Sequence, residues 1–143
     1  MPDDPFDLAR FRDAQDAGRT FDTALAELRG GQKRSHWMWF VFPQIAGLGQ
    51  SPTAVHYAIA SLDEARAYLA DPVLGPRLHD AARAALEAPA ASARALLGGI
   101  DAVKLRSAMT LFAHAAPEEA LFRAVLDRWF DGEEDPETLI RIR

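Results

Sequence analysis

A run of bulky side chains restricts the fold of this chain more than any other feature. The run reads His36-Trp37-Met38-Trp39-Phe40-Val41-Phe42 and lies between Ser35 and Pro43. Pro43 prevents simple continuation of a regular element, because its φ angle is fixed and it lacks a backbone N–H. A strand here would need a partner, yet no other segment alternates four or more apolar and polar residues. The run therefore predicts a helix at the centre of an all-α domain.

Helical patterns and helix-ending residues cover the rest of the chain. Thr20 and Asp101 are typical N-cap residues, and Ser61 with Glu64 matches a capping box. The stretch from Ile45 to Thr53 is expected to be an irregular linker. The expected helices and their ends are Phe6 to Phe11 before the Asp16-Ala17-Gly18 break, Thr20 to Gly30-Gly31, Ser61 to Asp71-Pro72, Pro76 to Leu86, Ala93 to Gly98-Gly99, Asp101 to Pro117, Leu121 to Asp131-Gly132, and Asp135-Pro136 to Ile140. We therefore predict one irregular multihelical domain over residues 1–143.

Size and composition limit the classes of protein to which the chain can belong. Its 143 residues suit one domain, and 49% of them are hydrophobic, which is enough for a buried core. The 16 Lys and Arg residues against 21 Asp and Glu residues give a net charge of −5, which disfavours nonspecific binding to nucleic acid. The absence of Cys excludes disulfides and thiolate zinc sites. The N-terminus carries no apolar run, so we expect no signal peptide, no membrane span and, by default, a cytoplasmic location.

Standard motifs for metals, cofactors and nucleophilic enzymes are missing from the sequence. The four His residues show no HExxH pair, and there is no P-loop, GxGxxG or GxSxG sequence. The acidic run Glu133-Glu134-Asp135 precedes a Pro-initiated helix, where the positive end of the helix dipole accounts for it. We therefore expect neither a metal site nor a cofactor.

Cationic and aromatic residues gather where the aromatic run begins. In a helix, Lys33 and His36 would share one side, and the first-turn amides near Ser35 would form a seat for a phosphate or carboxylate. Trp37 and Trp39 could stack on an adenine-like or nicotinamide-like ring. The alternative is that the run only fills the core, with His36 hydrogen-bonded beside it.

A second polar cluster lies on the long helix expected in the last third of the chain. It contains Asp101, Lys104, Arg106, Ser107 and Thr110. Lys104, Ser107 and Thr110 follow one another at three-residue spacing, and this polar stripe could face a ligand, because buried polar groups need partners. The alternative is a solvated face on which Asp101 caps the helix and pairs with Lys104.

The aromatic run and its flanks resemble the signature of a known family. The motif Gly31-x-Lys33-x-Ser35-His36-Trp37-Met38-Trp39-Phe40-x-Phe42-Pro43-Gln44 is similar to that of domain-of-unknown-function family 1810, whose members often carry the label calpastatin. The similarity continues to Asp135-x-x-Thr138-Leu139 and so covers nearly the whole chain. It implies a small, mainly helical bacterial domain and no particular reaction. The calpastatin label does not suit this chain, because such an inhibitor is a disordered repeat, whereas this composition fills a core.

A weaker resemblance links the chain to the NADAR superfamily, which processes N-glycosides of the ADP-ribose type. Lys33, Ser35 and His36 would match its first segment. The chain departs from that pattern, because no Glu separates Ser35 from His36, Phe42 replaces a Lys, and Arg141 replaces a Glu. These departures matter chemically, since glycosidic cleavage needs a carboxylate or an amine near the anomeric carbon.

Together these features lead us to expect a domain that binds ADP-ribose or another NAD-like nucleotide, with N-glycosidic cleavage as the reaction that the weaker resemblance implies. The expected ligand-binding residues are Lys33, Ser35, Trp37, Trp39, Gln44, Lys104, Ser107 and Thr110, and the expected catalytic residues are His36, as a general acid or base, and Asp101. The competing hypothesis is a non-catalytic helical module whose acidic surface meets a protein partner. The first hypothesis requires a concave pocket on which these side chains converge, and the second does not.

Overall fold

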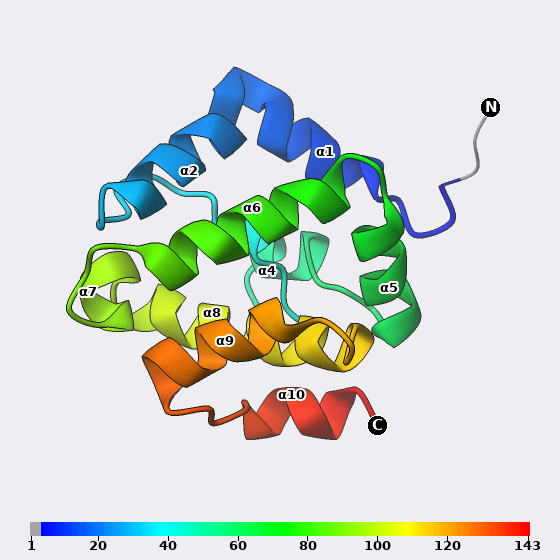
Figure 1. The fold of residues 1–143 in the computed structure, drawn as a ribbon. Helices are drawn as coiled ribbons and strands as arrows, with labels where there is room; N and C mark the ends of the chain where they lie inside the picture. Colours follow the sequence, from blue (N-terminus) through cyan, green and yellow to red (C-terminus); the bar gives the residue numbers. More distant parts are fainter. Residues whose placement is uncertain (1–3) are drawn as a thin grey trace.

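The elements of the computed structural model, which describes residues 4–143, are helices joined by turns and short loops (Figure 1). The helices are α1 Ala9–Asp16, α2 Thr20–Arg29, α3 Met38–Val41, α4 Pro52–His56, α5 Leu62–Ala70, α6 Leu74–Glu87, α7 Ala93–Leu97, α8 Gly99–Ala115, α9 Ala120–Phe130 and α10 Pro136–Arg141, with a 3-10 turn at Ala17–Arg19. An isolated parallel bridge pairs Ile45 with Ile59. The predicted all-α fold class is confirmed. None of the helices in this part of the chain has both the length and the apolarity needed to cross a membrane.

Side-chain caps begin several of these helices. The hydroxyls of Ser51, Ser61 and Ser92 each accept a hydrogen bond from the amide three residues later, at the starts of α4, α5 and α7. Asp135 does the same for α10. Each cap satisfies an amide that the first turn of a helix leaves without a partner. The predicted cap at Ser61 is therefore confirmed.

Two other predicted N-caps are wrong. Thr20 is the first residue of α2, and its hydroxyl donates to the carbonyl of Ala17 at 2.6 Å. The N-cap is Arg19, whose φ of +56° is left-handed. Asp101 lies inside the first turn of α8, whose N-cap is Gly98 with φ of +88°. In both places a residue with positive φ, Arg19 or Gly98, is the N-cap, so the helix begins at or before the residue that is predicted to cap it.

Most of the aromatic run is buried, with His36 exposed and Trp39 half-buried, but the run forms only one helical turn, α3. Trp37 is the N-cap of this turn, so His36 precedes the helix, and Pro43 ends the run as predicted. The predicted helix start near Ser35 is wrong, because the amides of that segment bond to a side chain from α2 instead of entering a helix.

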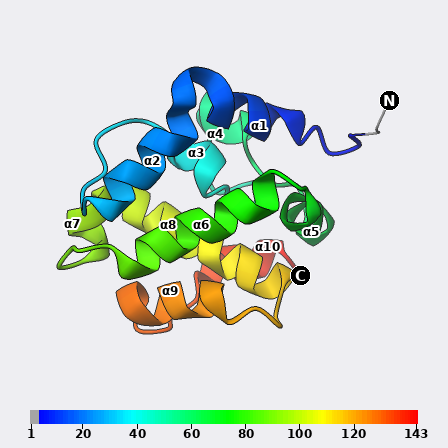
Figure 2. The same ribbon diagram turned by 45° about the horizontal axis from the view of Figure 1, so that its top comes forward.

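The helices pack around one core. α6 crosses the middle of the molecule between α2 and α9 (Figure 1), and α8 packs against α5, α7, α9 and α10. Figure 2 shows α3 near the centre of the view. The largest fully buried side chains of this core are Trp37, Tyr68, Phe11, Phe42, Phe112 and Phe122. The segment that leads into α3 therefore runs from the end of α2 into the core.

Candidate functional site

The chain contains two lysines, and both side chains reach Asp101. Lys33 Nζ lies 2.9 Å from Asp101 Oδ2, and Lys104 Nζ lies 3.5 Å from Asp101 Oδ1. The other residues counted as Lys or Arg are all arginines. The fold therefore brings both lysine ammonium groups to one carboxylate in the first turn of α8.

Each of these lysines also lies over a tryptophan ring. Lys33 Nζ is 5.1 Å from the ring centroid of Trp37, and Lys104 Nζ is 4.8 Å from that of Trp39. At such distances the negative face of the ring attracts the ammonium charge. Lys33 also donates to the carbonyl of Ser35 at 2.5 Å, and its side chain is only 9% exposed, compared with 20% for Lys104. Lys33 is thus the more firmly held of the two.

An open hollow of about 330 Å³ lies beside this cluster. Lys33, His36 and Asp101 supply its polar lining, and Trp39 is the largest of its apolar side chains. The start of α8 forms part of the wall, where the N-cap Gly98 has no side chain that could accept from the first-turn amides. The hollow therefore combines a largely buried cation, an exposed imidazole, a partly exposed indole and the N-terminus of a long helix.

The segment between α2 and α3 is held by Glu27, near the end of α2. Its carboxylate accepts four hydrogen bonds, from the amides of Arg34 at 2.8 Å and Ser35 at 3.1 Å, the Ser35 hydroxyl at 2.7 Å and the Trp37 indole at 2.8 Å. Burial opposes the ionisation of Glu27, but the hydrogen bonds outweigh it and lower its pKa to about 2. The sequence does not indicate this role of Glu27, because no spacing rule links a carboxylate on a helix to an irregular segment.

Glu27 changes the interpretation of two predicted ligand-binding groups. The amides near Ser35 are not a free anion seat, because the Glu27 carboxylate already occupies them. Trp37 is fully buried with its indole bonded to Glu27, so it belongs to the core and not to a stacking wall. Of the two predicted stacking residues, only Trp39 lines the hollow.

Lys104 does not line the hollow itself but contacts Asp101 and Trp39 of its lining. Three other predicted ligand-binding residues lie away from the hollow. Ser107 Oγ is 3.1 Å from Asp135 Oδ2, and the Thr110 hydroxyl accepts from the Asp135 amide at 2.9 Å. Ser107 and Thr110 are buried, and they hold the turn that begins α10. Gln44 lines a separate and much smaller hollow on another side of Trp39. In the predicted polar stripe, Ser107 and Thr110 therefore bind the start of α10, and of its members Lys104 alone reaches Asp101.

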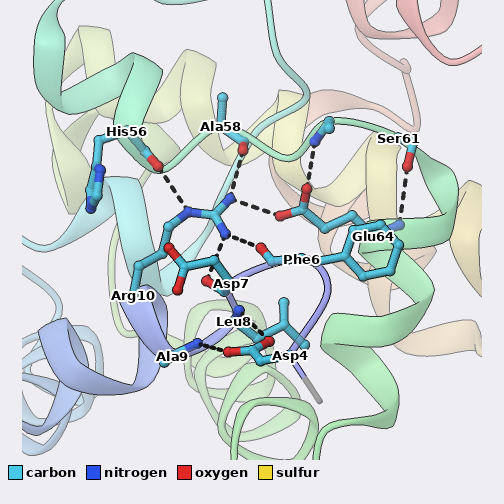
Figure 3. Close-up of polar contacts among 11 residues, drawn as sticks. Asp4, Phe6, Asp7, Leu8, Ala9, Arg10, His56, Ala58, Ser61 and Glu64 are labelled. Atoms are coloured by element: carbon cyan, nitrogen blue, oxygen red, sulfur yellow. Dashed lines mark hydrogen bonds and ion pairs between the residues drawn. The ribbon is translucent and has the colours of Figure 1, made fainter.

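Figure 3 shows a buried ion pair outside the hollow, between Arg10 of α1 and Glu64 of α5. Arg10 Nη2 lies 2.8 Å from Glu64 Oε2, and the other oxygen of Glu64 accepts from the Ala60 amide. The remaining N–H donors of Arg10 bond to the backbone carbonyls of Phe6, Asp7, His56 and Ala58. Because all five donors of the guanidinium have partners within the chain, this cluster fastens α1 to residues 56–64 and is structural.

Comparisons with known proteins identify relatives of the whole chain. A family model described as "Protein of unknown function (DUF1810)" matches residues 5–142, as the resemblance of the aromatic run predicts. The crystal structure of the conserved hypothetical protein Rv1873 from Mycobacterium tuberculosis is similar over 97% of this chain and 98% of its own, with 47% identity and a TM-score of 0.93. None of the curated proteins matches. These relatives share the fold, and their descriptions name no ligand.

Proposed function

The chain belongs to the family described as protein of unknown function DUF1810, and from this premise we propose that it binds a nucleotide-like anion, such as ADP-ribose, in the hollow beside Asp101. The convergence of Lys33 and Lys104 on Asp101 carries the proposal. Two ammonium groups share one carboxylate there, which leaves local positive charge in a chain whose net charge is −5. A phosphate gains from that charge and accepts hydrogen bonds from ammonium donors.

Trp39 supports a ligand that carries a flat ring. Its side chain lines the hollow and is partly exposed, while Lys104 lies over one part of its ring. Stacking of a base on an aromatic side chain contributes about 1–3 kcal/mol. We therefore place the base against the part of the indole that faces the hollow and the phosphate near the lysines.

The volume of the hollow limits how much of such a ligand it can hold. Small-molecule sites usually span roughly 300–1,000 Å³, and this hollow lies near the lower end of that range at about 330 Å³. It suits one end of ADP-ribose, such as the base with its ribose. The rest of the ligand would remain at the open side, where His36 is exposed.

Cleavage of an N-glycosidic bond is a narrower part of the proposal. His36 lines the hollow, and histidine can act as a general acid or base near neutral pH. The Asp101 carboxylate is engaged with both lysines, so its proposed role is to hold them and to stabilise positive charge beside it. Incubation with NAD, followed by chromatography of released nicotinamide, tests this reaction. Release that disappears in His36→Ala supports cleavage, whereas no release above buffer contradicts cleavage and leaves binding standing.

Calorimetric titration with ADP-ribose tests binding. Lys104→Met removes the ammonium charge but keeps a long side chain, and Arg66→Met removes an exposed cation that pairs with exposed Asp63 on α5. We expect binding by the unmodified protein at millimolar ligand or below and an affinity about tenfold lower in Lys104→Met, the usual effect of losing a charged hydrogen bond. Arg66→Met should bind normally.

Two outcomes of this titration contradict the proposal. If millimolar ADP-ribose produces no heat, ADP-ribose is excluded as the ligand. The non-catalytic interaction module then becomes the working hypothesis. Equal weakening by Lys104→Met and Arg66→Met would show attraction to overall charge and no defined site.

A further inference from the structure

We propose that Glu27 is a positioning residue for the hollow. Its ionised carboxylate holds the segment of residues 32–37, from which Lys33 and His36 reach the hollow. The inference rests on the proposed function for the identity of the ligand, whereas the arrangement that Glu27 maintains exists without any ligand.

The segment needs an external support because it has no regular structure of its own. Residues 32–37 belong to no helix, so no ladder of backbone hydrogen bonds fixes them. On one side, Glu27 accepts bonds from two amides, one hydroxyl and one indole of the segment. On the other side, the Lys33 amide donates to the carbonyl of Leu96 in α7 at 2.7 Å. The segment is thus suspended between α2 and α7.

Ser35 connects Glu27 directly to the lysine cluster. The amide and the hydroxyl of Ser35 both donate to the Glu27 carboxylate, at 3.1 and 2.7 Å. The carbonyl of the same residue accepts from Lys33 Nζ at 2.5 Å, and Lys33 Nζ lies 2.9 Å from Asp101. One continuous series of contacts therefore runs from Glu27 to Asp101, and Ser35 acts within it as a link and not as a ligand contact.

The ionised form of the carboxylate is the form that these contacts favour. Four N–H and O–H donors point at Glu27, and an ionised carboxylate accepts at all of its lone pairs without offering a hydrogen of its own. A neutral amide or a protonated carboxyl is a weaker acceptor for these donors, since hydrogen bonds to an ionised group are roughly twice as strong. The Glu27 carboxylate therefore occupies the amides that could otherwise bind a phosphate. The lysines remain as the groups that can bind the anion of the ligand.

Lysine modification provides a readout that needs no ligand. Because the chain has only two lysines, mass spectrometry can compare how fast an amine-directed reagent modifies Lys33 and Lys104 in the same sample. In the protein without substitutions we expect Lys33, with its 9% exposed side chain, to react more slowly than Lys104. In Glu27→Gln and Glu27→Ala we expect the ratio of the Lys33 to the Lys104 rate to rise about tenfold. Glu118→Ala, a change at an exposed Glu, should leave the ratio unchanged.

Chemical rescue separates the hydrogen-bonding role of Glu27 from its packing. Acetate has the atoms that Glu27→Ala removes, and acetamide has nearly the same shape without the charge. We expect acetate, and neither acetamide nor chloride, to restore the protection of Lys33 in Glu27→Ala. Circular dichroism confirms that each variant is folded, and if Glu27→Ala does not fold, the isosteric Glu27→Gln still tests the ratio.

The outcomes distinguish failure of this inference from failure of the proposed function. Protection of Lys33 in folded Glu27→Gln, or rescue by acetamide as good as that by acetate, overturns the positioning role. If the ratio of the Lys33 to the Lys104 rate rises in the Glu27 variants but the protein without substitutions binds no ADP-ribose, the positioning role stands and the proposed ligand fails. If the unmodified protein binds ADP-ribose and Glu27→Ala binds it equally well, the positioning role fails and the proposed ligand stands.

Discussion

Trp37 and Trp39 lie two positions apart and have different surroundings. Trp37 is fully buried with its indole on Glu27, whereas Trp39 lines the hollow beneath Lys104. The single turn of α3 begins between them, with Trp37 as its N-cap, so the two rings leave the backbone in different directions. Stability and ligand binding should therefore respond differently to their removal.

Replacing these tryptophans one at a time tests this division. Trp37→Ala should lower the free energy of unfolding by about 3–5 kcal/mol, because it leaves a large cavity in the core. Trp39→Ala should cost less stability, since part of its ring is already in solvent, but it should weaken ADP-ribose binding by about 1–3 kcal/mol. Urea unfolding and calorimetric titration measure the two effects. A larger loss of stability in Trp39→Ala would contradict the assignment.

Glu27 also predicts the direction in which acid destabilises the protein. Hydrogen bonds lower its pKa to about 2 in the fold from an ordinary value of 4.5, against the opposing effect of burial. Its contribution to stability is therefore complete above about pH 4.5 and is lost as the pH falls toward 2. Urea unfolding from about pH 5 to about pH 2.5 should show a larger fall in the unmodified protein than in Glu27→Gln. Equal falls would contradict this, since Asp4 and Glu134, whose pKa values are also lowered, are common to both.

At the scale of elements, α9 is held at both ends by histidine–carboxylate pairs. His79 of α6 lies 2.6 Å from Glu119, the N-cap of α9, and His114 of α8 lies 2.9 Å from Glu134 beyond its C-terminus. Nδ1 of His79 also contacts the carbonyl of Gly75 at 2.7 Å, and the imidazolium is the form that can donate at both ring nitrogens. Protonation of His79 therefore strengthens the contact between α6 and the start of α9.

Raising the pH should weaken this attachment. Partial burial opposes protonation of His79, but the bonds to Gly75 and Glu119 outweigh it and raise its pKa above 6.5. The stability that His79 contributes is therefore full below about pH 6.5 and is lost as the pH rises through the raised value. Between about pH 6 and about pH 9, the free energy of unfolding should fall less in His79→Gln than in the unmodified protein. His56→Gln, at an exposed His, should keep the full decrease.

At the scale of the whole molecule, the Arg10–Glu64 pair joins parts of the chain that are distant in sequence. The side chains are 11% and 4% exposed, and the pair ties α1 to α5 and to the stretch before it (Figure 3). Removing one member of a buried pair leaves the other charge without a partner, which costs far more than an exposed pair contributes.

Replacing Glu64 measures this contribution. Glu64→Ala should lower the free energy of unfolding by about 3–5 kcal/mol, because the Arg10 charge would remain buried. The matched change Asp63→Ala, which removes the exposed partner of Arg66, should cost no more than about 1 kcal/mol. Urea unfolding of both variants gives the comparison, and similar losses would show that Arg10 can reach solvent.

Local rules account for much of what can be predicted here. Pro43 ends α3 and Ser61 caps α5, because such residues act on the backbone within one turn. The same rules identify Lys33 and Asp101 as members of two separate polar clusters. They do not show that the clusters share one ion pair, because that contact depends on how α8 packs beside the segment that precedes α3.

By itself, the sequence determined that the chain is all-α, where most of its helices end, and that most of its aromatic run lies inside. Only the tertiary structure decided that Glu27 satisfies the amides near Ser35 and that Ser107 and Thr110 serve α10. Helix propensity and capping act between residues a few positions apart, whereas side-chain pairing depends on which distant surfaces exclude water together.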